Sequence, residues 1–398
     1  MLCPMAQRHV PQYDLVIVGA GPAGSTTARL AADSGCSVLL VDKRQELGAP
    51  IQCSGAVSRH ALEEVGIPIS DEFVQEAIYG FAIYDEAGTS TEIDYRQLKG
   101  DEYGAGPGLK PLGYVVDRRR FDRYLLTLAI RAGVETSLKT EATGYTCDAD
   151  GLATVSLVRY GELRSVRCRC VVGADGLMSQ VGRWAGLRTH IRNGELAACL
   201  QYVCDGVESR GLLEIVTGHR WAPGGYAWVF PKGHGYTEIG LGVTPNNTSL
   251  SAKQHLRQFM QDSFFAERFA DAKILEVQGG GVPLAAPLTT QYADRMILVG
   301  DAARHVNPIT GGGIHTALSG GRIAAQVLAK AVTAGETFTP QVTERYQEAW
   351  LEQLGEKMWK LYREKASIFR EQDISRRDAR LYATMSSYFS PTSEYKKI

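Results

Sequence analysis

The stretch Asp14-Leu-Val-Ile-Val-Gly19-Ala-Gly21-Pro-Ala-Gly24 decides the fold. Its apolar residues, 15–18, are typical of a buried parallel strand, and the glycines that follow have the spacing G-x-G-x-x-G. Residues 25–32, which are small or compatible with a helix and include no proline, then favour a helix. Gly19 allows the tight turn, Gly21 lets a pyrophosphate approach the backbone, and Gly24 lets the helix pack closely on the strand. The pattern predicts a dinucleotide site at a helix N-terminus.

A second apolar strand, residues 37–41, ends in Asp42, about twenty residues after the first glycine. A carboxylate at this spacing suits the ribose hydroxyls of an adenosine diphosphate group, because it can accept hydrogen bonds from them. The alternative is an ordinary strand-helix-strand crossover whose glycines serve only the turn. The paired signals favour dinucleotide binding.

The composition is that of an ordinary globular protein. With 398 residues the chain is long enough for more than one domain, and its net charge of −1 gives no sign of a nucleic-acid partner. The cysteines form no C-x-x-C pair, so we predict no metal site and a reduced, cytoplasmic environment. We expect no membrane-spanning segment, because no apolar run reaches about 18 residues.

Two further turns with glycine and aspartate follow predicted strands. Gly173-Ala-Asp175-Gly176 supplies one carboxylate, and Gly300-Asp301 supplies another after residues 295–299. Gly311-Gly312-Gly313 then opens a predicted helix, whose N-terminus suits the negative charge of a reduced flavin. Each turn alone has a purely structural alternative, but all three in this order indicate a single flavin dinucleotide.

Together these motifs resemble the FAD enzymes of the para-hydroxybenzoate-hydroxylase type, over nearly the whole chain. The resemblance implies an α/β fold (α+β overall), in which a Rossmann-type FAD-binding domain carries an inserted antiparallel substrate sheet and a C-terminal helical segment. It also implies that Arg118, in Asp-Arg-x-x-Phe-Asp, contacts the cofactor near its pyrophosphate. The alternative for Arg118 is a surface charge among three consecutive arginines.

The order of the motifs predicts that the second domain is inserted into the first, because pieces of the dinucleotide domain return three times along the chain. We expect helices at 58–65, 121–132, 251–270 and 313–334. The predicted division is the FAD-binding domain at 1–78, 112–190 and 280–335, substrate-domain strands at 79–111, the antiparallel substrate sheet at 191–279, and a C-terminal helical lid at 336–398.

A further motif narrows the reaction. Pro223-Gly-Gly-Tyr226-Ala-Trp228-Val-Phe230-Pro231 matches P-x-x-Y-x-W-x-F-P, which resembles the geranylgeranyl reductase family. That family saturates isoprenoid double bonds. On a strand the three aromatic side chains project from one face, so they predict an aromatic wall that binds substrate. An aromatic core stripe is the alternative.

The loop Gln52-Cys53-Ser54-Gly55 resembles the family's cysteine-bearing loop near the flavin ring. An isolated alkene accepts hydride only when a proton is delivered with it or slightly before, which develops cationic character. Aromatic rings stabilise such charge by about 0.5–2 kcal/mol each. We therefore assign catalytic roles to Cys53, Tyr226 and Trp228, with Cys53 placing or relaying the proton. A small buried packing residue is the alternative for Cys53.

Within the family, Cys53 followed by Ser-Gly in a chain of this length resembles the archaeal digeranylgeranylglycerophospholipid reductases, which act on membrane ether lipids. This resemblance implies an isoprenoid phospholipid substrate. No second nucleotide motif is evident in the sequence, so the external electron donor stays open between ferredoxin, a reduced nicotinamide and another flavin. The aromatic and charged residues after Trp350 suit a peripheral contact with the inner face of the cell membrane, or equally a lid packed on the protein itself. The motifs and the resemblance together give these cofactor-binding residues: Gly19, Gly21, Ala23, Gly24, Asp42, Cys53, Ser54, Gly55, Arg118, Ala142, Asp175, Asp301, Gly312, Gly313 and Ile314.

Four other activities remain open from the sequence. A chlorophyll-type geranylgeranyl reductase shares both chemistry and fold. A flavin monooxygenase or hydroxylase would need a polar pocket, which the aromatic stripe disfavours. A flavin-dependent halogenase carries W-x-W-x-I-P, from which this chain departs at Tyr226 and Phe230. An isoprenoid carrier that holds FAD structurally is the non-enzymatic alternative.

Overall fold

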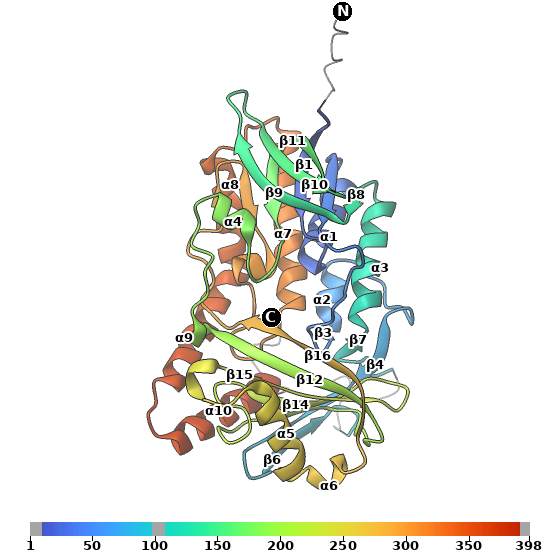
Figure 1. Cartoon of the computed structure of the whole chain (residues 1–398), viewed down its shortest axis with the longest axis vertical. Coiled ribbons are helices and arrows are strands. Elements are labelled where there is room, and N and C mark those ends of the chain that lie inside the picture. The colour runs from blue at the N-terminus through green and yellow to red at the C-terminus, as the bar shows by residue number, and fades with distance from the viewer. Residues whose placement is uncertain (1–9, 98–107, 391–398) are drawn as a thin grey trace, which may run out of the picture.

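The computed structural model describes residues 10–97 and 108–390 and is built on two large β-sheets and one small one (Figure 1). The strands of the first sheet are β1 (Gln12–Val18), β2 (Val38–Asp42), β8 (Glu135–Leu138), β9 (Thr140–Cys147), β10 (Ala153–Arg159), β11 (Glu162–Gly173), β17 (Tyr292–Ala293) and β18 (Met296–Leu298). Its central strands run parallel in the order β18-β11-β1-β2-β8. The strands β17, β10 and β9 extend it in antiparallel fashion.

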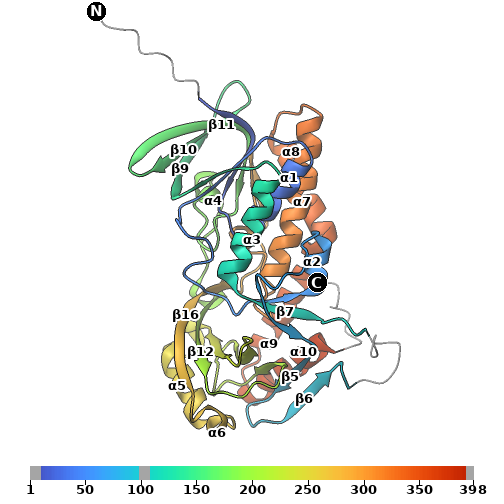
Figure 2. The same ribbon diagram turned by 90° about the vertical axis from the view of Figure 1, so that its right-hand side faces the viewer.

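One face of this sheet is covered by helices, namely α1 (Pro22–Asp33), α3 (Arg118–Arg131), α7 (Ile314–Thr333) and α8 (Pro340–Trp350). Figure 2 shows them on the side away from β9 and β10. Because side chains alternate along a strand, Leu15 and Ile17 pack in one buried cluster with Ala28 of α1 and Tyr346 of α8. Val16 joins the cluster on the opposite face. This arrangement confirms the predicted Rossmann-type FAD-binding fold.

The second sheet has the strand order β16 (Lys273–Pro283), β12 (Leu196–Asp205), β15 (Thr237–Val243), β14 (Tyr226–Pro231), β13 (Leu213–Val216), β5 (Gly80–Tyr84) and β6 (Ser90–Asp94). Neighbours are antiparallel except for β13 and β5, which run parallel because they come from separate segments that no hairpin joins. One face packs against α5 (Ala252–Asp262) and α6 (Ala266–Phe269). The other packs against α9 (Glu356–Phe369) and α10 (Ile374–Phe389).

A small sheet connects the two large ones in sequence. It consists of β3 (Ala56–Ser58), β7 (Gly113–Val116) and β4 (Val74–Ile78). In the sequence, α2 (Arg59–Glu64) follows β3, and α3 follows β7. The remaining short helix is α4 (Gln180–Trp184). A π-helical turn, Leu351–Gly355, joins α8 to α9.

Side-chain caps set the start of several helices. Ser58 accepts a hydrogen bond from the backbone N–H of Ala61 and caps α2, the helix predicted at 58–65. The start of α3 was predicted three residues too late, at 121. Asp117 caps this helix by accepting from the N–H groups of Arg119 and Arg120, so Arg118 already lies in its first turn. Because the helix begins at Arg118, the direction of the Arg118 side chain is set by the first turn of α3.

The predicted domain division stays a prediction, although the elements refine it. The strand β16 runs without interruption through position 280 to Pro283. Helix α8 contributes Val342, Tyr346 and Trp350 to the core of the first sheet, whereas α9 and α10 pack on the second sheet. The lid that we propose therefore consists of α9 and α10. Positions 1–9, 98–107 and 391–398 lie outside the described residues.

Candidate functional site

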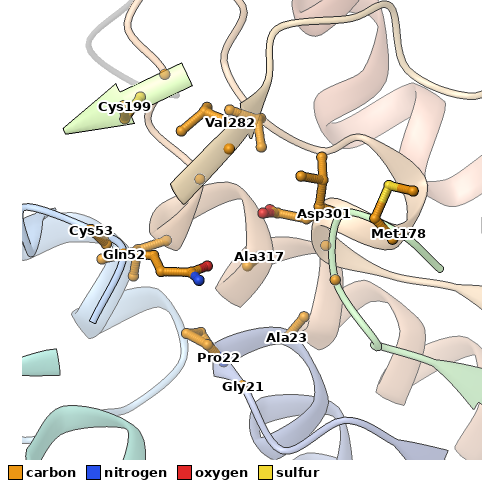
Figure 3. A pocket seen from close by; sticks show the side chains of 18 of the residues that line it. Gly21, Pro22, Ala23, Gln52, Cys53, Met178, Cys199, Val282, Asp301 and Ala317 are labelled. Carbon is orange, nitrogen blue, oxygen red and sulfur yellow. The ribbon is translucent and has the colours of Figure 1, made fainter. Parts of the chain in front are cut away.

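A cavity of about 730 Å³ lies where the carboxyl ends of β1 and β2 approach the second sheet and the lid helices. Figure 3 shows Asp301 pointing its carboxylate into this space, with Gly21 and Pro22 on one side and Cys199 and Val282 on the other. The predicted site residues that line it are Gly19, Gly21, Ala23, Asp42, Cys53, Ser54, Arg118, Ala142, Asp175, Tyr226, Trp228, Asp301, Gly313 and Ile314. Gly24, Gly55, Phe230 and Gly312 are not among its lining residues.

The turn between β1 and α1 leaves room for a ligand against the backbone. Gly19 has φ +106°, a conformation that favours glycine, and its N–H donates to the carbonyl of Val41 at 2.8 Å. A Cβ placed on Gly21 would meet nothing within 4 Å, so this residue borders open space in the cavity. The free N–H groups of α1 begin at this point and suit an anionic pyrophosphate.

Two carboxylates flank this turn. Asp42 Oδ2 accepts from the Ala20 N–H at 2.9 Å, and its Oδ1 accepts from the Arg44 N–H at 2.8 Å, which holds the side chain at the end of β2. Asp175 Oδ2 accepts from the backbone N–H groups of Gln180 and Val181 at the start of α4. Its buried Oδ1 has no hydrogen-bond partner within the described residues. A buried acceptor without a donor is uncommon, and a ligand hydroxyl or N–H would satisfy it.

Asp301 and Arg118 place opposite charges at the cavity wall. Arg118 is partly buried and forms a two-pronged ion pair with Asp122, both N–O distances being 3.0 Å. Burial by itself would lower the pKa of the guanidinium, but Asp122 and Cys53 outweigh burial and raise that pKa above its usual range. Burial raises the pKa of Asp301, and Arg118 opposes this only in part. Arg118 is therefore a fixed cation of the site and not a surface charge.

The loop before α7 is tied to both the aromatic strand and the lid. Asn307 Oδ1 accepts from the N–H groups of Ile309 and Thr310, which shapes the loop. The Tyr226 hydroxyl donates to the carbonyl of Thr310. The Asn307 side-chain amide donates to the hydroxyl of Tyr388 on α10 at 2.9 Å. The second sheet and the lid are thus hydrogen-bonded to the loop that opens α7.

The three aromatic residues of β14 follow one another as predicted, but they differ in position. The ring centroids of Tyr226 and Trp228 are 5.8 Å apart, and those of Trp228 and Phe230 are 6.4 Å apart. All three belong to or pack against the apolar cluster beneath α9 and α10, but only Tyr226 and Trp228 also line the cavity. Burial, then Cys199 and Cys53, raise the pKa of the Tyr226 hydroxyl above its usual range. That hydroxyl therefore stays protonated at neutral pH.

A buried ion pair connects the aromatic strand to the cysteine loop. Lys232 Nζ lies 3.0 Å from Glu238 Oε2, and both side chains are almost completely buried. The same ammonium donates to the backbone carbonyl of Ser54 at 2.9 Å, and the Trp228 indole N–H donates to Glu238 Oε1 at 3.1 Å. This network fixes the loop that carries Cys53 relative to Trp228.

Sequence reasoning missed several lining residues. Cys199 and Gln201 come from β12, Val282 from β16, and Lys365 from α9. Burial and Cys53 raise the pKa of the Cys199 thiol to about 12. The residues of β12 and β16 had no local signal, because only the register of the second sheet brings them to the cavity. Lys365 did have one, since it interrupts an apolar helix face.

The residues present fit a flavin adenine dinucleotide. Open space at Gly21 and the N-terminus of α1 suit its pyrophosphate, and the carboxylates of Asp42 and Asp175 suit hydroxyl groups. The apolar and aromatic end of the cavity, which includes Tyr226 and Trp228, leaves space for a second, apolar ligand.

Comparison with known proteins agrees with this geometry. Residues 12–350 match the family described as FAD binding domain. A digeranylgeranylglycerophospholipid reductase of Methanosarcina acetivorans is 36% identical over 86% of this chain and 81% of the relative. The second such reductase of Methanopyrus kandleri is 38% identical over 90% of this chain and 87% of the relative. The chain belongs to this family of FAD-dependent reductases. It is an FAD-binding oxidoreductase, as the motifs predicted.

Solved structures that superpose on this chain include a geranylgeranyl reductase-like protein and, at lower sequence identity, flavin-dependent halogenases. A geranylgeranyl bacteriochlorophyll reductase-like protein from Thermoplasma acidophilum superposes with a TM-score of 0.81 at 28% identity, covering 96% of this chain and 97% of that one. The flavin-dependent halogenase CmlS superposes with a TM-score of 0.70 at 19% identity, covering 98% of this chain and 68% of that one. The halogenase likeness concerns the fold alone.

Gly21→Ala is expected to weaken FAD binding by about 10- to 100-fold without unfolding the protein, because its methyl group would occupy space in the cavity and touch no protein atom. FAD titration of the apoprotein, followed by flavin fluorescence, measures the affinity. Gly144→Ala is the matched control, since a Cβ there also meets nothing within 4 Å and Gly144, unlike Ala142 of the same strand, is not among the lining residues. Equal affinities in the two variants would contradict the assignment of Gly21.

Proposed function

We propose that this FAD-dependent reductase saturates the isoprenoid double bonds of membrane ether lipids by adding a hydride and a proton. The observation that carries the proposal is that one cavity joins the dinucleotide loop at Gly21 to the aromatic residues Tyr226 and Trp228 and to apolar residues of the lid. The relatives described above are named as digeranylgeranylglycerophospholipid reductases, and their sequence identities of 36% and 38% to this chain support an isoprenoid lipid as its substrate. When bound, FAD supplies the hydride.

The chain's own residues bind the lipid and exclude water. Tyr226 and Trp228 form one wall of the cavity, and Ile368, Phe369 and Leu381 of the lid form part of another. These surfaces suit a branched hydrocarbon chain, because burying apolar area is favourable and needs no directional contact. Aromatic faces also stabilise positive charge that develops on the alkene, by about 0.5–2 kcal/mol per ring.

Three of the weak acids that line the cavity could deliver the proton beside the aromatic strand. They are the thiols of Cys53 and Cys199 and the hydroxyl of Tyr226. The Tyr226 hydroxyl is held by the Thr310 carbonyl, and the Cys53 sulfur accepts from the Gly55 N–H at 3.4 Å. We assign the placing or relaying of the proton to Cys53, since Lys232 holds its loop against the aromatic strand.

The experiment that tests the function uses purified holoprotein, reduced with dithionite and kept anaerobic. A digeranylgeranyl phospholipid is added, and the flavin spectrum and the lipid mass are recorded. We expect the oxidised flavin spectrum to return while the lipid gains two hydrogens for each double bond reduced. A reduced flavin that persists beside unchanged lipid would refute the proposal and direct assays to phenols and halides in air.

Cys53→Ala is expected to slow this reoxidation at least tenfold while FAD stays bound, because a positioned proton donor typically contributes 10²–10⁴-fold. Single-turnover rates of the two reduced proteins measure the effect. Cys147→Ala is the control, since Cys147 is exposed and does not line the cavity. Full turnover in Cys53→Ala would remove the proton role from this residue.

The electron donor and the location in the cell complete the proposal. We propose that an external donor, ferredoxin or a reduced nicotinamide, reduces the flavin. We also propose a cytoplasmic protein that meets the inner face of the membrane through its lid, where its lipid substrate resides. Among the described residues no helix is long and apolar enough to cross a bilayer. Copurification with vesicles of the ether lipid, compared with lid-deleted protein, would test the membrane contact.

A further inference from the structure

A group of cations lies around Glu195 and Tyr362, and one member, Lys365, lines the cavity. It consists of Lys365 on α9, Arg304 at the end of the short helix Gly300–Ala303, and Arg192 before the turn Asn193–Glu195. We call these three residues the cation cluster. Glu195 and Tyr362 lie beside it, and Glu195 is the acidic residue that acts on the pKa of Lys365 and Arg304.

Two members of the cluster are held by backbone carbonyls, and Glu195 acts on them without forming an ion pair. Lys365 lines the cavity, and its ammonium donates to the carbonyl of Leu284 at 3.0 Å. Arg304 donates to the carbonyl of His190 at 2.6 Å, and its buried Nε has no partner within the described residues. Glu195 accepts from the Tyr362 hydroxyl at 3.3 Å. Across residues 10–97 and 108–390, no carboxylate lies within ion-pair distance of any member of the cluster.

Lys365 and Arg304 are partly buried, whereas Arg192 is exposed. A partly buried cation without an ion-pair partner is disfavoured, because burial without pairing penalises the charged form. That cost appears directly in the cluster. Burial lowers the pKa of the Lys365 ammonium to about 8, although Glu195 opposes this, and burial also lowers the pKa of Arg304. An anion placed against Lys365 would replace the missing partner.

The position of Lys365 indicates where that anion belongs. Its neighbours along the cavity wall are apolar residues of the lid, Ile368, Phe369 and Leu381, and its ammonium is a single charge among them. A ligand that matches this surface carries an anionic group at one end of a hydrocarbon chain. Phosphate on a glycerol ether has this form.

We propose that the cation cluster, with Lys365 in direct contact, binds the phosphate group of the isoprenoid lipid whose chains occupy the cavity. This inference rests on the proposed function, which names the lipid. Lys365 fixes the headgroup, so it determines which end of the lipid enters the cavity and excludes uncharged isoprenoid alcohols. Arg304 and Arg192 raise the local positive potential, and Arg304 also holds the loop at His190.

The test compares two probes on the oxidised holoprotein, digeranylgeranylglyceryl phosphate and digeranylgeranylglycerol, with binding followed by the change in flavin fluorescence. Wild-type protein is expected to bind the phosphorylated lipid about 10- to 100-fold more tightly, as a charge-assisted hydrogen bond predicts. Lys365→Met is expected to abolish this preference while keeping its affinity for the neutral lipid. Lys365→Arg should retain most of it. Lys357→Met, which removes an exposed charge from the same helix, should behave as wild type.

Folding gives an independent reading. A purely structural Lys365 would leave a less stable protein when replaced, whereas a cation held for an anion costs stability, so Lys365→Met should melt at the same or a higher temperature in the absence of lipid. Inorganic phosphate is titrated in a separate arm. If inorganic phosphate binds as tightly as the phosphorylated lipid and competes with it, the cluster is a site for free phosphate, and the proposal that it binds the lipid headgroup is wrong.

The failure of this inference can be told from the failure of the proposed function. Equal binding of both lipids by the wild type, together with reoxidation of the reduced flavin by either one, would overturn the phosphate site and leave the reductase intact. A wild-type preference that survives in Lys365→Met would also overturn it. Binding of neither lipid would overturn both proposals.

Discussion

Replacing Lys232 with methionine is expected to lower the free energy of unfolding by about 3–5 kcal/mol. The substitution keeps the length of the side chain but leaves Glu238, which has 0% exposure, buried without its ion-pair partner. It also removes the donor to the Ser54 carbonyl, so the loop that carries Cys53 loses its link to the aromatic strand. Urea unfolding of the holoprotein, followed by far-ultraviolet circular dichroism, measures the loss.

The double variant Lys232→Met/Glu238→Gln should recover much of this stability, because it removes the unpaired charge and keeps an acceptor for the Trp228 indole. Arg164→Met is the control, since it breaks the exposed pair between Arg164 and Glu162 and should leave the unfolding midpoint unchanged. A single variant at Lys232 as stable as the wild type would show that water reaches Glu238.

Gly24→Ala is expected to cost about 3 kcal/mol of stability and to abolish FAD retention. A Cβ at this position would lie 1.9 Å from the carbonyl oxygen of Gly19 and 3.1 Å from the Cβ of Ala174. Both neighbours belong to rigid backbone at the strand ends, so helix α1 must move away from β1. That movement displaces the turn at Gly21, where we place the pyrophosphate.

Thermal unfolding and the flavin content of the purified protein measure these two effects. Gly144→Ala again serves as the control, because alanine fits there without contact. The comparison with Gly21→Ala separates the two glycines: Gly21→Ala should fold normally and bind FAD weakly, whereas Gly24→Ala should fail in both. A Gly24→Ala protein that retains full flavin content would show that α1 can shift without disturbing the cofactor.

The parts of the fold that the sequence predicted well are those specified by short-range patterns. The strand-turn-helix unit at β1 and α1 and the helix predicted at 313–334, observed as Ile314–Thr333, follow from local apolar runs, glycines and caps. Asp42 and Asp301 follow directly from their positions after strands. The family motif contributed the aromatic residues of β14, of which Tyr226 and Trp228 line the cavity.

The parts that were missed depend on pairing between distant segments. Lys232 and Glu238 meet only because β14 and β15 form a hairpin whose burial on both faces cannot be read from a short stretch. Cys199 and Gln201 reach the cavity only through the register of β12. Lys365 was within reach, because Met358, Leu361 and Ile368 mark one buried helix face and Lys365 falls on it. A charge on an apolar stripe was the overlooked signal.

The strand order of the first sheet has a consequence for the synthesis of the protein. β1 and α1 leave the ribosome first, but β18, Asp301 and α7, which complete their domain, follow only after the second sheet has been made. A nascent chain that ends before β18 leaves part of one edge of β11 without its parallel neighbour and lacks the helix that packs on α1. The cofactor site is therefore complete only when β18 and α7 have been made, and a chain terminated before β18 is not expected to hold flavin.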